Sequence, residues 1–162
     1  MNTIVLLTGG NLGNRTSILT DAKKAIELQV GKIKQASIFI ESEAWGFESA
    51  HPFLNQILII STNQSAIEVL NTIQQIELDL GRVRKKEQWS SRLIDIDILF
   101  YNKESINSDR LTIPHKHIRD RRFTLYGLNT IIPEFNHPQY NKTIEQLLVE
   151  CSDKSKVGEY HA

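Results

Sequence analysis

The stretch RLIDIDILF, residues 92 to 100, has the alternating pattern of a β-strand. Successive side chains along a strand point to opposite faces of the sheet, so residues two apart share a face. The pattern predicts a strand from Arg92 to Tyr101 that is apolar on one face and carries two carboxylates on the other. The first face would hold Ile94, Ile96, Ile98 and Phe100, and the second Leu93, Asp95, Asp97 and Leu99.

The segments before this strand alternate between strand and helix patterns. Strands are expected over residues 3–8, 34–41 and 53–61, and a helix over residues 15–29. Ser65 and Glu68 have the spacing of a capping box, which predicts a second helix that ends at Gly81. Its expected apolar stripe is Ile67, Leu70, Ile73, Ile76 and Leu80.

The resulting order is strand, helix, strand, strand, helix, strand. This order is typical of a ferredoxin-like split βαβ sandwich, an α+β fold with an antiparallel-dominated sheet and helices packed on one of its faces. Beyond it we expect a hairpin arm at 105–111, helices at 117–130 and 143–150, and a frayed polar tail from about residue 151. With 162 residues, the whole chain 1–162 is expected to form a single domain.

Composition excludes several classes of protein. Lys plus Arg and Asp plus Glu both number 19, and this net charge of zero argues against nucleic-acid or membrane-surface partners. Cys151 is the only cysteine, so no intramolecular disulfide can form. No apolar run approaches the ~20 residues of a membrane span, and the N terminus has no basic lead-in. We therefore expect a cytoplasmic protein, most simply a monomer.

Asp95 and Asp97 are the first candidates for chemistry. Their Cα atoms would lie roughly 7 Å apart on one face, given a rise of ~3.3 Å per residue. Two neighbouring carboxylates repel each other unless a cation lies beside them, and hard oxygen ligands suit Mg²⁺. A pair of metal ions could share them and hold a phosphoryl group. The alternative is that the two aspartates only make a solvated sheet face.

The arginines are the second feature. Residues 82–122 contain eleven basic and six acidic side chains, including seven of the eight arginines of the chain. Arginine holds phosphate through two parallel hydrogen bonds, so arginines beside metal-binding carboxylates indicate a site for a polyphosphate such as ATP. The alternative is an ordinary solvated charged surface. No P-loop motif is present in the sequence.

Aromatic side chains are the third feature. Trp45, Phe53, Trp89 and Phe123 lie in or beside the loops expected around the acidic strand, where a flat heterocycle could stack between two rings. The Asn55 amide could recognise the edge of such a ring. Phe53 and Phe123 taken singly are equally explained as core residues, whereas Trp89 lies in a polar loop with no apolar stripe to join.

These residues together resemble a known family. The motifs that carry the resemblance are Gly81-Arg82-Val83-Arg84-Lys85 after a helix with Gln74 and Glu77, then Trp89, Arg92-x-x-Asp95-Ile96-Asp97, Leu111-Thr112-Ile113-Pro114-His115 and Arg121-x-Phe123. The chain resembles 6-hydroxymethyl-7,8-dihydropterin pyrophosphokinases of folate biosynthesis from about Thr3 to His137. The resemblance implies transfer of pyrophosphate from ATP to the pterin hydroxymethyl group, with release of AMP.

The resemblance also implies a role for each matching residue. Asp95 and Asp97 would bind two Mg²⁺ ions, and Arg82 and Arg92 would be the catalytic cations. The expected ATP contacts are Gln74, Arg84, Arg110, Thr112, His115 and Arg121. The expected pterin contacts are Ser42, Glu43, Ala44, Trp45, Phe53, Asn55, Trp89, Asp95 and Phe123. The loops 42–52 and 82–91 would order over the bound substrates.

Two other functions remain open from the residues alone. One is a different metal-dependent nucleotidyl- or phosphoryl-transferase, which would release pyrophosphate or ADP in place of AMP. The other is a ferredoxin-like RNA-binding module whose sheet aromatics stack on bases. The zero net charge and the two aspartates on the strand disfavour the second.

Overall fold

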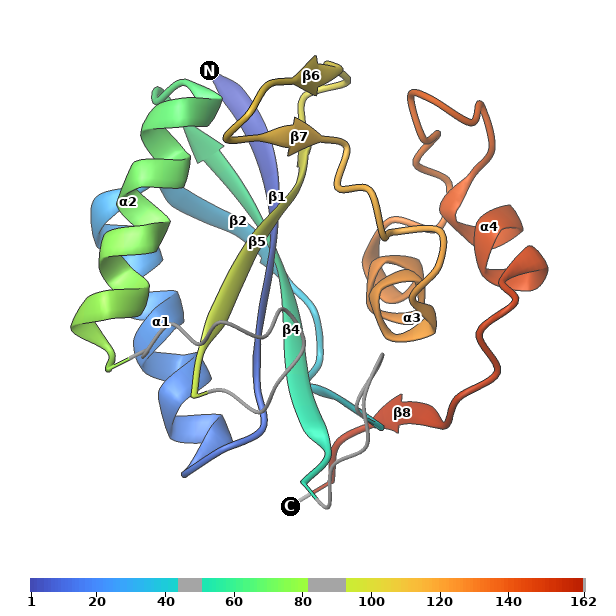
Figure 1. Cartoon of the computed structure of the whole chain (residues 1–162), viewed down its shortest axis with the longest axis horizontal. Helices are drawn as coiled ribbons and strands as arrows, with labels where there is room; N and C mark the ends of the chain where they lie inside the picture. Colours follow the sequence, from blue (N-terminus) through green and yellow to red (C-terminus); the bar gives the residue numbers. More distant parts are fainter. Residues whose placement is uncertain (44–50, 82–92, 162) are drawn as a thin grey trace.

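The computed structural model of the chain describes residues 1–43, 51–81 and 93–161. Its main sheet has the strand order β5-β1-β4-β3-β8, with β2 also paired to β4 (Figure 1). All of these pairings are antiparallel. The strands are β1 (Asn2–Gly10), β2 (Lys32–Ala36), β3 (Ile40–Ser42), β4 (Phe53–Thr62), β5 (Asp95–Tyr101) and β8 (Val157–Glu159). The ferredoxin-like order predicted from the sequence is confirmed.

Two helices cover one face of the sheet. They are α1 (Arg15–Gln29) and α2 (Ala66–Asp79), and each follows a strand of the split βαβ order. Asn14 caps α1 by accepting the N–H of Ser17, and Ser65 and Glu68 form the expected capping box at the start of α2. A core of aliphatic side chains such as Leu6 and Leu58 fills the space between these helices and the sheet.

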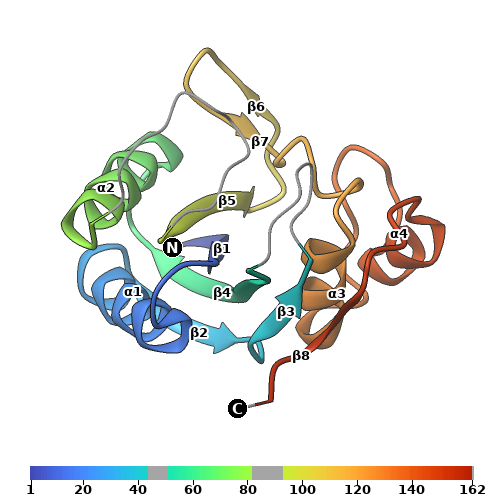
Figure 2. The ribbon, with the colours of Figure 1, turned by 60° about the horizontal axis from the view of Figure 1, so that its bottom comes forward.

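The second face is covered as well, which differs from the single helical face expected. Helices α3 (Arg122–Ile131) and α4 (Ile144–Glu150) lie on the side of the sheet opposite to α1 and α2 (Figure 2). A separate apolar cluster joins α3 to the sheet through Leu125 and Leu128. Because both faces are buried, β1 and β4 are apolar along most of their length rather than alternating.

The segment expected to be one strand over residues 34–41 is two strands, β2 and β3. Ser37 lies between them, and its hydroxyl accepts the N–H of Ile57 at 2.9 Å. The backbone carbonyl of Ser37 also accepts the side-chain amide of Gln56 at 2.9 Å. Ser37 therefore stays hydrogen-bonded to β4, although it belongs to neither β2 nor β3.

The apolar stripe of α2 is shifted from the predicted one. Ile67 is 39% exposed, whereas Ala66 and Val69 are buried beside Ile73 and Ile76. Leu70 and Leu80 only pack at the margin of the core. The capping box fixes where α2 begins, but the phase of its buried face is set by packing against β5.

Three further boundaries differ from the sequence-based expectations. The helix expected from residue 117 begins at Arg122, because Arg121 is extended at its N-cap and the preceding residues form turns. The arm consists of β6 (Ile106–Asn107) paired with β7 (Thr112–Ile113). The tail expected to fray instead adds β8 to the sheet beside β3, and Cys151 is buried.

The acidic strand β5 contains a β-bulge. Its register with β1 shifts so that Val5 pairs with Phe100 and Leu6 with Ile98, which leaves Leu99 as the extra residue. Ile96 and Ile98 share one face, as predicted, and that face packs toward α1 and α2, but Leu99 and Phe100 both join the cluster under α3. The prediction that Phe100 shares a face with the isoleucines is therefore wrong beyond the bulge.

None of the helices in the part of the chain that the structure describes is long and apolar enough to cross a bilayer.

Candidate functional site

A row of paired residues crosses the sheet near one end. Asp95 of β5 pairs with Gly9 of β1, Gly9 pairs with Asn55 of β4, and Asn55 pairs with Ile40 of β3. Directly paired residues project to the same face, so this row lies on the α3 side of the sheet. Asp97, two residues along β5, projects to the same face. The pairing of the two carboxylates that the sequence predicted is thus present on the α3 face.

Gly9 leaves room for the Asn55 side chain. A β-carbon at Gly9 would overlap Asn55 Nδ2 and lie 3.0 Å from Asn55 Cγ. The amide nitrogen donates to the carbonyl oxygen of Thr8 at 3.3 Å. The Asn55 carbonyl oxygen Oδ1 is buried and has no hydrogen-bond partner among the described residues. The amide therefore lies over β1, toward Asp95, with an acceptor that is satisfied only by a ligand or water.

The residues predicted to flank a pterin lie around this row. Phe53 of β4 pairs with Ser42 of β3, and the Ser42 hydroxyl is buried without a hydrogen-bond partner in the part of the chain that the structure describes. Phe123 lies in the first turn of α3, partly buried, with the Arg121 guanidinium 5.9 Å from its ring centre. Glu43 accepts the backbone N–H of Lys156 at 2.7 Å, so the C-terminal segment holds it in place.

A cavity of about 260 Å³ lies at the outer edge of β5, between that strand, α2 and the β6–β7 arm. Asp97 is on its wall, together with three of the residues predicted to contact ATP. The lining residues are Leu70, Ile96, Asp97, Ile98, Arg110, Leu111, Thr112, His115 and Lys116. Apolar side chains on both walls of the cavity suit a flat heterocycle, and Arg110, Lys116 and Asp97 suit a phosphate chain with its cation.

Gln74 and Arg110, both predicted to contact ATP, lie together beside this cavity. Arg110 Nη2 donates to Asn71 Oδ1 at 2.6 Å and lies 3.5 Å from Gln74 Oε1. The bond to Asn71 ties the β6–β7 arm to the exposed face of α2. The guanidinium is therefore held at the mouth of the cavity before any nucleotide arrives.

His115 is neutral in this site. Burial of the ring and the nearby positive charge of Arg121 lower the pKa of His115 to about 4. Its Nδ1 accepts the backbone N–H of His117 at 3.1 Å, so the neutral ring carries its proton on Nε2. The side chain therefore presents a fixed hydrogen-bond donor to the cavity.

Glu77 is a functional candidate that the sequence argument named only as part of a motif. It is 4% exposed, and its carboxylate accepts the N–H of Ile96 at 2.8 Å. Ile96 lies between the two aspartates, and its N–H points away from β1. An acidic residue in phase with the buried stripe of α2, at Ile73 and Ile76, is the pattern that could have identified it.

Several predicted site residues lie outside the described residues. These are Ala44, Trp45, Arg82, Arg84, Trp89 and Arg92, and with them most of the two loops expected to order over the substrates. The structure brings together the rest of the predicted set, in two groups that meet at β5. The predicted pterin contacts lie around the row from Asp95 to Asn55. Of the predicted ATP contacts, Arg110, Thr112 and His115 line the cavity beside Asp97, Gln74 lies next to Arg110, and Arg121 lies next to Phe123.

The acidic pair fits a cation that keeps several positions for other ligands. In the described part of the chain, no cluster of three or more His, Cys, Asp or Glu side chains could hold a metal ion. Mg²⁺ is commonly held by one or two carboxylates, with phosphate oxygens and water as its remaining ligands. Two carboxylates beside a cavity with basic walls have that chemistry.

Comparisons with known proteins show the family to which the chain belongs. The family model of 7,8-dihydro-6-hydroxymethylpterin-pyrophosphokinase matches residues 5–133. A protein of Aquifex aeolicus named 2-amino-4-hydroxy-6-hydroxymethyldihydropteridine pyrophosphokinase is 37% identical over 150 residues, which are 93% of this chain and 92% of that protein. A protein of the same name from Bacillus subtilis is 31% identical over 163 residues, 99% of this chain and 97% of its own length.

The fold is similar to that of solved structures. Wild-type HPPK-DHPS of Plasmodium falciparum superposes with a TM-score of 0.72 at 21% identity. The match covers 93% of this chain but only 43% of the Plasmodium chain, so the present chain corresponds to less than half of that protein. At this identity the likeness concerns the fold.

Proposed function

The chain belongs to the 7,8-dihydro-6-hydroxymethylpterin-pyrophosphokinase family, and we propose how its described residues perform that family's reaction. The reaction is the transfer of pyrophosphate from ATP to the hydroxymethyl group of 6-hydroxymethyl-7,8-dihydropterin in folate biosynthesis, with release of AMP. The observation that carries the proposal is the position of β5. Asp97 lines the cavity suited to ATP, and Asp95 begins the row that continues through Gly9 to Asn55.

The nucleotide is proposed to bind in the cavity at the outer edge of β5. Leu70 and Ile98 would contact the adenine ring, and Arg110 and Lys116 would neutralise phosphate charge at the mouth. His115 would donate a hydrogen bond from Nε2 without adding a charge of its own. Gln74, Thr112 and Arg121 complete the ATP contacts in the described part of the chain.

The pterin is proposed to lie over Gly9 with its edge toward Asn55. Asn55 Oδ1 and the Ser42 hydroxyl, neither of which has a hydrogen-bond partner among the described residues, would accept the N–H groups of the ring edge. Phe123 would stack on one side of the ring, with Phe53 beside it. This orientation directs the hydroxymethyl group toward Asp95 and the phosphates beyond it.

Asp95 and Asp97 are the proposed ligands of Mg²⁺, with two ions shared between the pair. Mg²⁺ bound there would neutralise charge on the phosphate chain and align it for attack on the β-phosphorus. The protein's own contribution is positioning: β5 holds both carboxylates on one face, and the two substrates approach them from different sides. Arg82 and Arg92 remain the proposed catalytic cations, and Arg84, Trp89, Ala44 and Trp45 the proposed loop contacts.

The proposal is tested by product analysis. Protein, ATP, Mg²⁺ and 6-hydroxymethyl-7,8-dihydropterin are incubated, and AMP, ADP and pyrophosphate are separated by chromatography. AMP that forms only when the pterin is present supports the proposed chemistry. ADP or pyrophosphate in its place would assign the site to another phosphoryl- or nucleotidyl-transferase and overturn it.

A matched pair of variants tests the acidic pair. Asp97→Asn keeps the shape of the side chain but removes its charge, and we expect turnover to fall by about three orders of magnitude or more. The control is Asp21→Asn on the exposed face of α1, which should leave turnover unchanged. Circular dichroism should show that both variants are folded. An active Asp97→Asn variant would remove this residue from the site.

We also propose that the chain acts as a cytoplasmic monomer without a nucleic-acid partner. Its balanced charge supports the absence of a nucleic-acid partner, since a nucleic-acid binder usually carries a basic excess. Light scattering on the purified protein would give the mass in solution. A stable dimer, or RNA binding that weakens steeply with salt, would contradict the proposal.

A further inference from the structure

Among the described residues, six side chains in the α3 half of the molecule have a buried polar atom without a hydrogen-bond partner, and three of these side chains are themselves buried. Two of these three, Ser42 and Asn55, already belong to the proposed pterin site. The third is Thr124, whose side chain is 1% exposed and whose Oγ1 has no partner. A buried hydroxyl without a hydrogen bond costs roughly 1–3 kcal/mol. Such a group therefore requires an explanation outside the folded chain itself.

The position of Thr124 on α3 directs its side chain at the sheet. Residues three and four apart on a helix are neighbours on its surface, so Thr124 adjoins Gly127 and Leu128. Both of these are buried against the sheet. A β-carbon at Gly127 would lie 2.5 Å from Ile40 Cδ1 and 2.9 Å from Ile57 Cγ1. Thr124 therefore lies in the middle of the buried face, one turn closer to the N terminus of α3.

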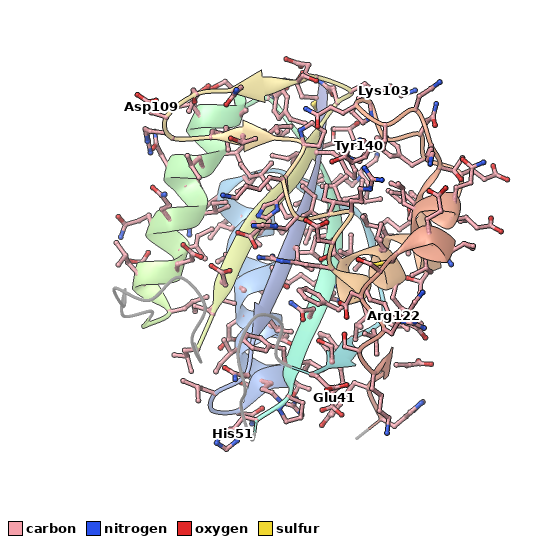
Figure 3. All side chains as sticks on the ribbon, turned by 45° about the vertical axis from the view of Figure 1, so that its right-hand side comes forward. Glu41, His51, Lys103, Asp109, Arg122 and Tyr140 are labelled. Atoms are coloured by element: carbon pink, nitrogen blue, oxygen red, sulfur yellow. The ribbon has the colours of Figure 1, made fainter. Side chains whose placement is uncertain are left out.

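That turn of α3 lies over the end of the sheet that carries the Gly9–Asn55 row. The N–H of Arg122 donates to Asp153 at 3.0 Å, and the segment after Asp153 enters β8 beside Ser42. At the other end of α3, the following chain reaches Phe135, whose ring lies 4.7 Å from that of Phe100. Figure 3 shows Arg122 toward the same end of the molecule as Glu41 and His51, with Tyr140 toward the opposite end.

We propose that the Thr124 hydroxyl is a specificity-determining contact for the pterin, which it reaches directly or through one bound water. The inference rests on the proposed function, since it assigns one more side chain to the same pterin site. Phe123, the neighbouring residue, would contact the face of the ring, while Thr124 offers both a donor and an acceptor to a polar edge. The Thr124 hydroxyl, which has no hydrogen bond to the described residues of the free protein, would then form one only when the substrate binds.

Thr124→Val separates this role from a structural one. Valine has the shape of threonine without the hydroxyl, so the free protein should become more stable, with its Tm raised by about 2–4 °C. Pterin binding should weaken by about 3- to 10-fold, the loss expected for one hydrogen bond. Stability and affinity thus change in opposite directions. Thr124→Ser keeps the hydroxyl and should retain the affinity of the unchanged protein.

The matched control is Thr62→Val. Thr62 is also 1% exposed, but its hydroxyl donates to the carbonyl of Val30 at 2.6 Å and accepts the N–H of Gln64 at 3.1 Å. This substitution should lower the Tm and leave pterin affinity unchanged. The two substitutions are therefore expected to change the Tm in opposite directions, and only Thr124→Val is expected to weaken pterin binding.

The measurements are thermal unfolding of the free protein and calorimetric titration with 6-hydroxymethyl-7,8-dihydropterin. The titration contains Mg²⁺ and α,β-methylene-ATP, whose bridging carbon prevents cleavage of the bond that the reaction breaks. Unchanged pterin affinity in Thr124→Val, or a lowered Tm in that variant, would overturn the inference. Failure of the unchanged protein to bind pterin would instead overturn the proposed function.

Discussion

At the scale of single residues, the site depends on Gly9, because this residue has no side chain. Asn55 can lie across β1 only because residue 9 is glycine, and this places its amide beside Asp95. The sequence indicated Asn55 as a possible contact for a ring edge. It did not indicate that Gly9 is the residue that makes room for it, because a glycine at the end of a strand is equally explained by the turn that follows.

We expect Gly9→Ala to weaken pterin binding while the fold is kept. The added methyl group overlaps the Asn55 amide and must displace it from the face of β1. Affinity for the pterin should fall by about tenfold or more, the equivalent of a lost hydrogen bond, while binding of Mg²⁺ and α,β-methylene-ATP without pterin stays the same. Calorimetric titration measures both.

Gly158→Ala is the control for this prediction. A β-carbon at Gly158 has no atom within 4 Å, so the substitution fills open space at the edge of β8. Equal pterin affinities in the two alanine variants would show that the position of Asn55 does not matter for binding.

At the scale of elements, α2 and β5 form one unit. Glu77 near the end of α2 binds the N–H of Ile96, and this bond fixes the stretch of β5 that carries both aspartates. Within residues 1–43, 51–81 and 93–161 the strand has no neighbour in the main sheet on that side, and the Glu77 side chain accepts the hydrogen bond that a paired strand would otherwise accept. The sequence predicted both elements but not this bond, because it depends on the phase at which α2 packs.

Replacing Glu77 should therefore weaken nucleotide binding, because β5 loses the bond that fixes its position. Glu77→Leu leaves the buried N–H of Ile96 without its acceptor, which costs roughly 1–3 kcal/mol of unfolding free energy. It should also weaken binding of Mg²⁺ with α,β-methylene-ATP. Glu77→Gln keeps an oxygen acceptor and should restore most of that affinity. Denaturant unfolding and calorimetric titration give the two quantities.

Glu27→Leu provides a comparison from the neighbouring helix. Glu27 of α1 accepts the N–H of Ile33 of β2 at 3.1 Å, at an exposed position away from the aspartates. Its loss should cost less stability and leave nucleotide affinity unchanged. If Glu77→Leu and Glu27→Leu bind nucleotide equally well, Glu77 does not position the acidic strand.

At the scale of the whole molecule, the order of elements could be predicted and the second helical layer could not. The loop between residues 42 and 52 is too short for a crossover helix, which makes β3 and β4 antiparallel neighbours. Helix α3 has no side-chain cap that would mark its start, and its place on the second face depends on long-range packing. The strand β8 is equally remote from its partner β3 in the sequence.

The whole fold should lose stability in mild acid through His137. Burial lowers the pKa of His137 to about 4, with the ring stacked on Tyr140 at 4.4 Å and edge-on to Phe100. In the unfolded chain a histidine titrates near 6.5. As the pH falls from 6.5 to 4, the unfolded state gains a proton that the folded state does not. The free energy of unfolding therefore falls, by up to roughly 3 kcal/mol from this residue.

Denaturant unfolding at several pH values between 7 and 4 tests this prediction. His137→Gln removes the titrating ring, so its stability should depend less steeply on pH over that range, whatever its stability at pH 7. His161→Gln, at an exposed position near the C terminus, should retain the slope of the unchanged protein. Parallel profiles for all three proteins would assign the acid sensitivity to other groups.

The bulge in β5 makes the length of that strand as important as its composition. Leu99 is the one residue that lets Asp95 and Asp97 face α3 while Phe100 faces α3 as well. Deleting Leu99 would restore regular alternation and keep Asp95 and Asp97 on the same face as Phe100. Deleting Ile96 instead would make the two aspartates adjacent, so that one carboxylate would turn into the aliphatic layer beneath α1 and α2. We therefore expect relatives to tolerate loss of the bulge residue, but not loss of a residue between the two aspartates.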